Sequence, residues 1–264
     1  MAIKIHNTAV IDKRAAIGKN VEIAPYAVIG ENVVIGDGTF IGPHSVIEHA
    51  VIGRNNYLSA HVFIGFAPQD FKYKGERTKV LIGDNNIIRE GVSIHRGSAS
   101  TKVTIIGSGC MFMANSHAGH DCRIGNNVIM TNSAAAAGHV EIEDNAIISG
   151  LSAIHQFVRI GRLCMISGGA MVNQDIIPYT TAQGDRARPV CLNVVGLKRN
   201  GINAESIRSI KRAFRILFFE NLSLEKALAK IRSENLSPEA RHIADFCESS
   251  RRGIARPTKQ RGEK

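Results

Sequence analysis

Aliphatic residues return at every sixth position along most of the chain between Ile11 and Val172. Glycine, aspartate or asparagine often follows them, as in Ile17-Gly18 and Ile160-Gly161. A period of six fits neither an amphipathic helix nor a single strand, and it is typical of the hexapeptide repeats that build a parallel β-helix. The repeated positions are Ile11, Ile17, Ile23, Ile29, Ile35, Ile41 and Ile47, then Ile52, Leu58 and Ile64, then Ile82, Ile88 and Ile94, and finally Ile106, Phe112, Ala118, Ile124, Met130, Ala136, Ile142, Ile148, Ile154, Ile160, Ile166 and Val172.

Each six-residue unit is expected to form a short strand and a corner, with its aliphatic side chain pointing inward. If three units close one triangular coil, residues 18 apart stack on one another, and successive coils lie about 4.8 Å apart. The inward positions then make roughly eight coils, and only the stack of coils is stable. The period does not set the handedness, because parallel crossovers are normally right-handed.

Two interruptions of the period predict loops. Between the second and third aliphatic runs the inward positions would fall on Asp70 and Glu76, which cannot face a dry core without partners. Residues 66–79 are therefore expected to leave the side of the prism, and a smaller excursion is expected at 97–103. Loops on a rigid scaffold often carry function.

The six-residue pattern ends near Pro178, and helical patterns follow it. The sequence therefore predicts a β-helix over residues 1–177, followed by a linker and a C-terminal helical domain over 178–264. The polar, basic tail at 251–264 is expected to fray. The expected helices are 204–220 with Asn203 as its N-cap, a second that follows Ser223, and a third that begins at Ser237-Pro238.

The formal net charge of +10 lies entirely in the second part of the chain. Residues 1–185 carry 15 Lys+Arg and 15 Asp+Glu, whereas residues 186–264 carry 18 and 8. A basic surface can attract an acidic protein or nucleic acid, or it can be a solvated helix face without a partner. No nucleic-acid-binding motif accompanies the charge, so a nucleic-acid partner is not expected.

The five cysteines are scattered and form no C-x-x-C pair, which favours reduced thiols and a cytoplasmic location. Three of them, Cys110, Cys122 and Cys164, lie in the repeats and are interpreted as small packing residues. The N-terminus lacks the apolar core of a signal peptide. No stretch approaches the ~20 apolar residues of a membrane span.

Four histidines in the third aliphatic run fall into register when the sequence is stacked in steps of three repeat units. We therefore expect polar groups from three coils to converge along one edge of the prism. The members of this cluster are His120, Gly138 and Gln156 in one column, Asp121, His139 and Phe157 in the next, and His117 and His155 beside them.

Three kinds of function can use such a cluster. An imidazole, whose ordinary pKa is about 6.5, can act as general base on an attacking hydroxyl. The N–H of Gly138 would then stabilise an oxyanion. Histidines can also bind zinc, and a scaffold can carry them without catalysis. Because no G-x-S-x-G motif is present and neither column contains a cysteine, a base acting directly on the substrate needs the fewest assumptions.

Several further motifs follow one another along the chain. They are P-Q-D-F-K-Y at 68–73, S-I-H-R-G at 93–97, N-S-H-A-G-H-D-C at 115–122, A-G-H-V at 137–140, I-H-Q-F at 154–157, A-Q-G at 182–184 and N-V-V-G-L-K-R at 193–199. Together they resemble the acyl-[acyl-carrier-protein]–UDP-N-acetylglucosamine O-acyltransferases of lipid A biosynthesis. The resemblance runs in order from about residue 9 to about 250, and the combination of motifs is far more specific than the repeat.

The resemblance implies a left-handed β-helix, a helical C-terminal domain, and a homotrimer with active sites between subunits. It implies transfer of an (R)-3-hydroxyacyl group from acyl carrier protein to the 3-hydroxyl of UDP-N-acetylglucosamine, without a cofactor or metal. In the matching motifs His120 is the general base, Asp121 orients it, and Gly138 supplies the oxyanion N–H. The implied contacts to nucleotide sugar or acyl donor are His117, His139, His155, Gln156, Asp70 and Lys72, with Arg199 for phosphate or the carrier arm.

Two positions depart from the pattern. Asn200 stands where the family often has a second arginine, and Arg186 where relatives can carry histidine near the end of the acyl chain. Gly168 leaves the implied acyl groove open, which favours a donor of about twelve to fourteen carbons, since each buried methylene contributes about 0.8 kcal/mol.

Two enzyme classes on the same fold are weaker alternatives. The N-acyltransferases of the same pathway carry a uridine-binding domain before the repeats, and here the repeat has already begun by Ile11. A zinc hydratase of the γ-carbonic-anhydrase type needs three histidines at a subunit interface. His117, His139 and one more could be imagined in that role, but Asp70 and Lys72 would be unexplained.

Overall fold

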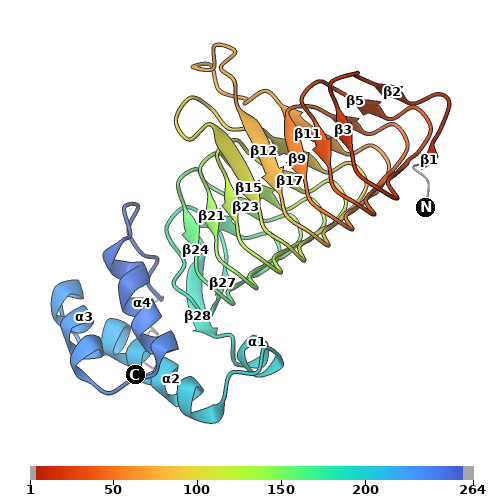
Figure 1. Cartoon of the computed structure of the whole chain (residues 1–264). Coiled ribbons are helices and arrows are strands. Elements are labelled where there is room, and N and C mark those ends of the chain that lie inside the picture. Colours follow the sequence, from red (N-terminus) through yellow and green to blue (C-terminus); the bar gives the residue numbers. More distant parts are fainter. Residues whose placement is uncertain (1–3, 258–264) are drawn as a thin grey trace.

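The computed structural model describes residues 4–257, so residues 258–264 of the expected basic tail lie outside the description. The described part of that tail does not fray as expected, because Ile254 pairs with Asp175 of the β-helix, and Ile254 and Ala255 are buried. Most of the chain winds as a left-handed parallel β-helix of triangular section, and four helices gather at its C-terminal end (Figure 1). The expected fold class is therefore confirmed. No helix among the described residues is both long and apolar enough to cross a membrane.

Each coil consists of three short strands, and from β1 to β26 stacked strands are three places apart in the chain and pair in parallel. The three faces of the prism are called sheets A, B and C. Sheet A contains β1 (Lys4–Ile5), β4 (Glu22–Ile23), β7 (Phe40–Ile41), β10 (Tyr57–Leu58), β13 (Ile87–Ile88), β16 (Met111–Phe112), β19 (Ile129–Met130), β22 (Ile147–Ile148), β25 (Met165–Ile166), β27 (Thr180–Gln183) and β28 (Arg188–Leu192). Sheet B contains β2 (Val10–Ile11), β5 (Val28–Ile29), β8 (Val46–Ile47), β11 (Phe63–Phe66), β14 (Ser93–His95), β17 (His117–Ala118), β20 (Ala135–Ala136), β23 (Ala153–Ile154) and β26 (Met171–Val172). Sheet C contains β3 (Ala16–Ile17), β6 (Val34–Ile35), β9 (Ala50–Ile52), β12 (Lys79–Ile82), β15 (Val103–Ile106), β18 (Arg123–Ile124), β21 (Glu141–Ile142) and β24 (Arg159–Ile160).

Most stacked strands are offset by three repeat units, as the period predicts; Lys4 pairs with Glu22, for example. The offset grows where loops leave the prism. Tyr57 pairs with the distant Ile87, because the chain between β11 and β12 has left the prism. Ile87 pairs with Met111, again beyond the regular offset, because a second loop lies between β14 and β15. The loops span residues 67–78 and 96–102, where the sequence predicted 66–79 and 97–103.

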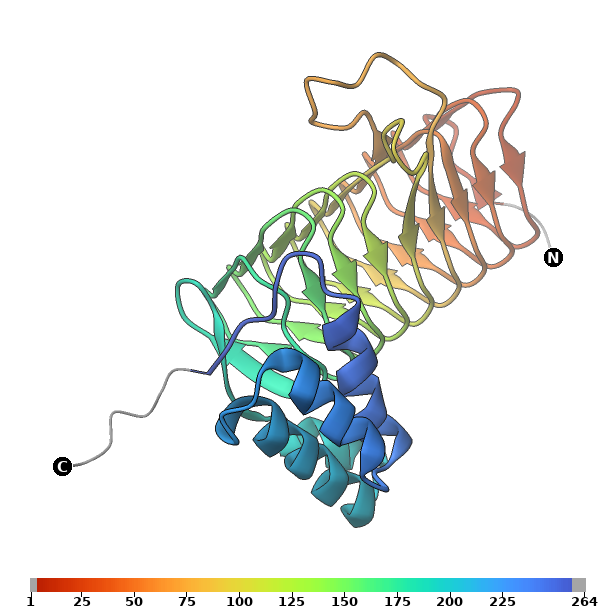
Figure 2. The ribbon, with the colours of Figure 1, turned by 90° about the vertical axis from the view of Figure 1, so that its left-hand side faces the viewer.

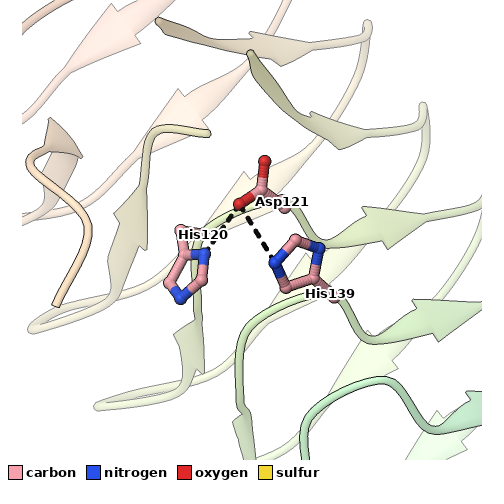
Figure 3. Close-up of side chains that lie close together, drawn as sticks. All are labelled: His120, Asp121 and His139. Carbon is pink, nitrogen blue, oxygen red and sulfur yellow. Dashed lines mark hydrogen bonds and ion pairs between the residues drawn. The ribbon is translucent and has the colours of Figure 1, made fainter. Parts of the chain in front are cut away.

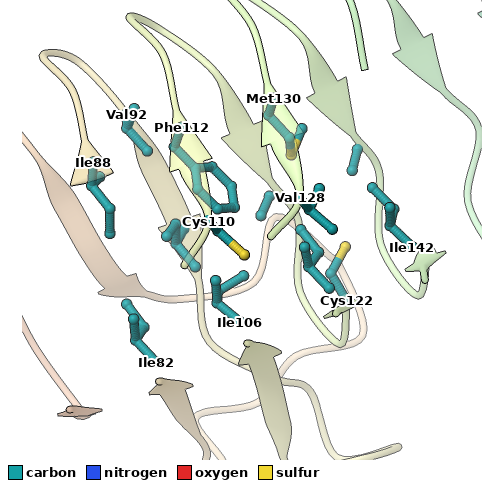
Figure 4. Close-up of a cluster of buried hydrophobic side chains, with 14 of the residues drawn as sticks. Ile82, Ile88, Val92, Ile106, Cys110, Phe112, Cys122, Val128, Met130 and Ile142 are labelled. Atoms are coloured by element: carbon teal, nitrogen blue, oxygen red, sulfur yellow. The ribbon is translucent and has the colours of Figure 1, made fainter. Parts of the chain in front are cut away.

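The core is one column of aliphatic and small side chains along the axis of the prism (Figure 4). In a typical strand the second residue points inward and is buried, whereas the first points outward. Cys110, Cys122 and Cys164 are buried as packing residues, and all five cysteines are free. The side chains at the twelve-position aliphatic run are all buried, from Ile106 to Val172.

Beyond residue 177 the structure differs from the expected linker. β27 continues sheet A parallel to β25, and β28 folds back on it as an antiparallel strand. A short helix, α1 (Val194–Arg199), then begins after the N-cap Asn193 and was not predicted. Sheet A thus continues past residue 177 to Leu192. The division of the chain into two domains after residue 177 stays a prediction.

The three predicted helices are present, and each begins at its expected N-cap. α2 (Ala204–Phe219) follows Asn203, α3 (Leu224–Ser233) follows Ser223, and α4 (Pro238–Glu248) follows Ser237. Figure 2 shows these helices packed together beside the end of the β-helix. Their apolar faces form a second core that includes Leu163, Ile177 and Tyr179 from that end of the β-helix.

The inward and outward residues of one strand should differ sharply in their contribution to stability. Ile35 is 1% exposed, and its neighbour Val34 is 40% exposed. We expect Ile35→Ala to lower the free energy of unfolding by about 2–5 kcal/mol, because it opens a cavity between the stacked coils. Val34→Ala should change it by about 0.5–1 kcal/mol at most. Denaturant unfolding of both variants provides the measurement, and equal losses would contradict the inward assignment.

Candidate active site

The histidine cluster lies on the edge of the prism where sheet B turns into sheet C. His120 follows β17, and His139 and Gln156 follow β20 and β23, the next two strands of sheet B. These strands pair at the regular offset of one coil, which confirms the stacking of the two predicted columns. The loop between β11 and β12 leaves the same edge, so Asp70 and Lys72 come to the same region as the histidines.

The second column owes its shape to left-handed backbone. Asp121 and His139 both have φ of 61°, and Phe157 has φ of 65°. This conformation is tolerated by aspartate and disfavoured for a bulky residue, and it bends the chain sharply at each corner. The bend brings the Asp121 carboxylate onto its neighbour: Oδ2 lies 2.7 Å from Nδ1 of His120 (Figure 3).

Asp121 is the most constrained group of the cluster, and its side chain is completely buried. Its carboxylate accepts hydrogen bonds from the backbone N–H groups of Ser98, at 3.0 Å, and Thr101, at 3.3 Å, and also from the Thr101 hydroxyl. Burial alone would raise the pKa of Asp121, but the hydrogen bonds from His120, Thr101 and Ser98 outweigh it and hold this pKa well below its ordinary value. Asp121 is therefore ionised at neutral pH.

His139 lies beside the same carboxylate oxygen. Its Nε2 is 3.5 Å from Oδ2 of Asp121, and its ring stands perpendicular to that of His120, with the centroids 5.2 Å apart. The other face of the ring stacks on Phe157 at 4.5 Å. Burial lowers the pKa of His139, although Asp121 opposes this shift. His139 is therefore neutral at neutral pH and can act as a hydrogen-bond donor or acceptor.

The group of three potential metal ligands within the described chain is His120, Asp121 and His139, whose ligand atoms lie within 4.8 Å of one another. His117 is not among them. A zinc hydratase would need its three histidines at a subunit interface, so that arrangement stays an alternative. A metal bound to Asp121 would compete with the hydrogen bonds that the carboxylate already accepts.

Gly138 lies against the imidazole of His120. A Cβ atom at this position would lie 2.5 Å from Nε2 of His120, so any side chain would displace the ring. The N–H of Gly138 donates no hydrogen bond within residues 4–257. The site thus presents Nε2 and a free backbone donor side by side.

A cavity of about 620 Å³ opens in front of these groups. The ejected loop forms one wall and the histidine corners form the other. The residues that line it include Gln69, Asp70, Lys72, Tyr73, His120, His139, Gln156 and Phe157. Its walls carry hydrogen-bonding and charged groups of both signs, as a polar ligand with hydroxyl and anionic groups requires.

The remaining histidines of the cluster, His117 and His155, lie outside the lining of this cavity. His117 Nδ1 is 2.8 Å from the hydroxyl of Ser93, and its ring meets the buried His95 edge to face at 4.9 Å. His155 is exposed, with Nδ1 3.1 Å from the carbonyl oxygen of Gln156. Neither His117 nor His155 lines the cavity of the single chain.

Three other predicted site residues lie elsewhere. Gly168 lies in a corner between β25 of sheet A and β26 of sheet B, so it is on a different edge of the prism from His120. A Cβ on Gly168 would meet only the carbonyl oxygen of Gly150, at 3.4 Å, which leaves open space around it. Arg186 is exposed in the β27–β28 turn, and Arg199 is exposed in the last turn of α1.

Sequence reasoning missed Ser98 and Thr101, which hold the Asp121 carboxylate. The sequence indicated the loop that contains them but not their position relative to Asp121. An excursion at 97–103 was expected, and hydroxyl residues are frequent in it. The break in the repeat removes the register that would have placed them beside Asp121.

Comparison with protein families agrees with the fold. Residues 32–66 match the bacterial transferase hexapeptide (six repeats), and residues 175–255 match domain 2 of UDP N-acetylglucosamine O-acyltransferase. The triangular β-helix with a polar histidine edge thus places the chain among the hexapeptide-repeat transferases.

Comparison with individual proteins shows to which family of these transferases the chain belongs. An acyl-[acyl-carrier-protein]–UDP-N-acetylglucosamine O-acyltransferase from Thermodesulfovibrio yellowstonii is 50% identical over 256 residues, covering 96% of this chain and 99% of the relative. The corresponding protein of Myxococcus xanthus is 48% identical with the same coverage. The crystal structure of a UDP-N-acetylglucosamine acyltransferase from Bacteroides fragilis superposes with a TM-score of 0.92 at 42% identity, covering 95% and 99% of the two chains. The chain belongs to the family of acyl-[acyl-carrier-protein]–UDP-N-acetylglucosamine O-acyltransferases, so the resemblance is confirmed.

His95 should make the stability of the protein depend on pH. Burial, with the nearby His117, His120 and Arg96, lowers the pKa of His95 to about 4. In the unfolded chain this pKa returns to about 6.5. Between these values the unfolded state binds more protons. The titration of His95 therefore has no effect on stability above about pH 6.5, where both states are neutral, and it lowers the unfolding free energy as the pH falls towards 4.

Replacement of His95 by glutamine should therefore flatten the pH dependence of the unfolding free energy in this window. The slope should fall by up to about 1.4 kcal/mol per pH unit, the limit for one proton. Urea unfolding of the wild type and His95→Gln across the window provides the comparison. Parallel curves would show that His95 does not titrate in the folded state as described.

Proposed function

We propose that the protein transfers an (R)-3-hydroxyacyl chain from acyl carrier protein to the 3-hydroxyl of UDP-N-acetylglucosamine, the first step of lipid A biosynthesis. His120 acts as the general base, without a covalent enzyme intermediate. The observation that carries the proposal is the His120–Asp121 pair, 2.7 Å apart, at the wall of a polar cavity. Membership of the family supports the classes of donor and acceptor.

The geometry of the pair supports direct base catalysis. The ionised Asp121 holds a proton on Nδ1 of His120, which leaves Nε2 free to accept another. Nε2 removes the proton from the sugar hydroxyl while its oxygen attacks the thioester carbonyl carbon. The carbon–sulfur bond then breaks, and the imidazolium of His120 returns the proton to the leaving thiolate of the carrier.

Gly138 is assigned the stabilisation of the tetrahedral intermediate. Its N–H has no partner in the described chain, and its Cα lies against the ring that acts as base. A fixed N–H donor aimed at the developing oxyanion costs no reorganisation during the reaction.

The residues around His120 also favour a mechanism without a covalent intermediate. Ser98 and Ser100 line the cavity, but His120 hydrogen-bonds to Asp121 and to neither serine, which favours a base that acts on the substrate over one that activates a serine nucleophile. Cys122 is buried, and burial raises the pKa of its thiol. The substrate hydroxyl is therefore the group on which the base acts.

The cavity is assigned to the nucleotide sugar. Asp70 and Gln156 can bind sugar hydroxyl groups, and the cation of Lys72 suits a phosphate. His139 faces the same space beside the reacting centre. His117 and His155 do not line the cavity of the single chain, and we assign them to outer contacts of the nucleotide sugar or to the acyl donor.

The donor side is assigned to the basic part of the chain. Acyl carrier proteins are acidic, and the net charge of +10 lies in the residues after 185. Arg199 is exposed in α1 and can bind a phosphate or the carrier arm. A cytoplasmic location fits the five free cysteines, four of which are buried.

A homotrimer reconciles the two parts of the proposed site. His120 and Gly168 lie on different edges of the same prism, on either side of sheet B. One chain therefore cannot line a single groove with both residues. If sheet B of one subunit faces the next subunit, the catalytic edge of one chain meets the Gly168 edge of another, as in a closed ring of identical subunits.

Loss of the base should remove turnover without unfolding the protein. We expect His120→Ala to lower kcat by roughly 10²–10⁴-fold, the usual contribution of a general base. Asp121→Asn should cost less, because orientation is only part of the effect. Steady-state assays with a 3-hydroxyacyl carrier protein and UDP-N-acetylglucosamine, with melting temperatures as a control for folding, make the test. Turnover of His120→Ala within a few-fold of wild type would refute the assignment.

The acyl groove should shorten when Gly168 is filled. The wild type is expected to prefer donors of about twelve to fourteen carbons, each added methylene contributing about 0.8 kcal/mol. Gly168→Met places its side chain in the open space beside Gly150 and should shift the preference towards shorter donors. The ratio of kcat/KM for donors of different length measures the shift. A wild type that already prefers ten carbons would exclude the open groove.

Mixing of subunits tests the trimer with the same variants. Each of His120→Ala and Gly168→Met lacks one half of the site, but in a mixed trimer the wild-type halves of two neighbours meet. Co-expression should therefore restore turnover of long-chain donors that neither variant supports alone. A monomer in sedimentation at micromolar concentration, or no restored turnover, would contradict a site shared between subunits.

A further inference from the structure

The smaller loop, residues 96–102, lies between the larger loop at residues 67–78 and the His120–Asp121 pair. It connects β14 to β15, one coil after the larger loop that connects β11 to β12. Both therefore leave the edge between sheets B and C (Figures 1 and 2). The proposed function so far gives residues 96–102 no task, although they contact both the larger loop and the catalytic pair.

At its first residue the excursion holds the larger loop. The side chain of Arg96 is 13% exposed, and its guanidinium donates to the carbonyl of Gly65 at 2.6 Å. Its Nε donates to the hydroxyl of Tyr73 at 3.1 Å, and that hydroxyl donates to the carbonyl of Glu76 at 2.9 Å. The guanidinium also lies 5.5 Å from the centroid of the Tyr73 ring.

Tyr73 closes the turn that carries the proposed sugar-binding groups. Its N–H donates to the carbonyl of Asp70 at 3.0 Å, and the carboxylate of Asp70 accepts from the N–H of Lys72 at 3.0 Å. Asp70 and Lys72 thus lie in a tight turn whose end is tied to Arg96. The tip of this loop is exposed, since Phe71 is 110% exposed. Such a loop needs contacts at its ends to keep one conformation.

Further along, the same excursion holds the catalytic pair. Ser98 and Thr101 direct two backbone N–H groups and one hydroxyl at the carboxylate of Asp121. The hydroxyl of Thr101 in turn donates to the carbonyl of Val103 at 2.9 Å or to the carboxylate. Asp121 is consequently held by residues 96–102 as well as by His120.

We propose that residues 96–102 act as a positioning bracket that sets the nucleotide-sugar loop at a fixed distance from the catalytic pair. Arg96 positions Asp70 and Lys72 through Tyr73, and Thr101 positions His120 through Asp121. None of these bracket residues need touch the reacting atoms. The inference rests on the proposed function, in which the sugar hydroxyl must approach Nε2 of His120 within hydrogen-bond reach.

The two ends of the bracket predict different kinetic signatures. Arg96→Gln should raise KM for UDP-N-acetylglucosamine by about ten-fold with little change in kcat, since it frees the binding loop; Tyr73→Phe should show the same pattern more weakly. Thr101→Val should lower kcat by roughly 3–30-fold with little change in KM, the effect of one lost hydrogen bond to a charged group. Thr101→Ser keeps the hydroxyl and should restore most of kcat.

Lys102→Gln is the matched control, because Lys102 is exposed in the same segment and its side chain makes no hydrogen bond or ion pair among the described residues. It should leave both constants unchanged. The bracket is refuted if Arg96→Gln and Thr101→Val, with wild-type melting temperatures, leave KM and kcat unchanged, or if both alter the two constants alike. The proposed function fails separately, through an active His120→Ala variant.

Discussion

The parallel ladder between successive coils is the interaction on which the rest of the structure depends. Its hydrogen bonds, 2.8–3.0 Å long between strands such as β17 and β20, fix equivalent residues of successive coils above one another. The buried aliphatic column supplies the free energy that keeps the coils stacked. Because each corner repeats the last, functional groups that are one coil apart in the sequence lie in line without any long-range search by the chain. His120 lies over Gly138 for this reason.

The corners convert this regular frame into a site. Asparagine, which tolerates left-handed backbone, occupies many equivalent corners, such as Asn127 and Asn145. At the catalytic edge the same position holds Asp121, His139 and Phe157. For Phe157 this conformation costs on the order of 1–2 kcal/mol, and its half-exposed ring gains little burial in return. Phe157 instead stacks on His139, and this contact holds the His139 ring against the catalytic pair.

The period predicted the fold and the two columns because both depend on spacing alone. The period also determines the edge on which Gly168 lies. Gly168 is two repeat units away from Gln156, whereas residues of one column are three units apart, so Gly168 belongs to another edge. The contacts of Ser98, Thr101 and Arg96 could not be predicted, since the loops that bring them to the site interrupt the period. For the same reason β27, β28 and α1 were missed: after Val172 the chain leaves the repeat, and local propensity alone does not show that a strand pairs with β25.

The charge of Asp121 connects this frame to the chemistry. Its side chain is completely buried, and within the described chain its ion-pair partners are the two histidines and no lysine or arginine. Backbone and hydroxyl donors stabilise the carboxylate, but its charge is not neutralised while both imidazoles are neutral. When His120 takes the proton of the substrate, a cation forms 2.7 Å from this anion, in a site already oriented to receive it. The interaction is therefore stronger in the transition state than in the ground state, which is the condition for it to accelerate the reaction rather than only to stabilise the fold.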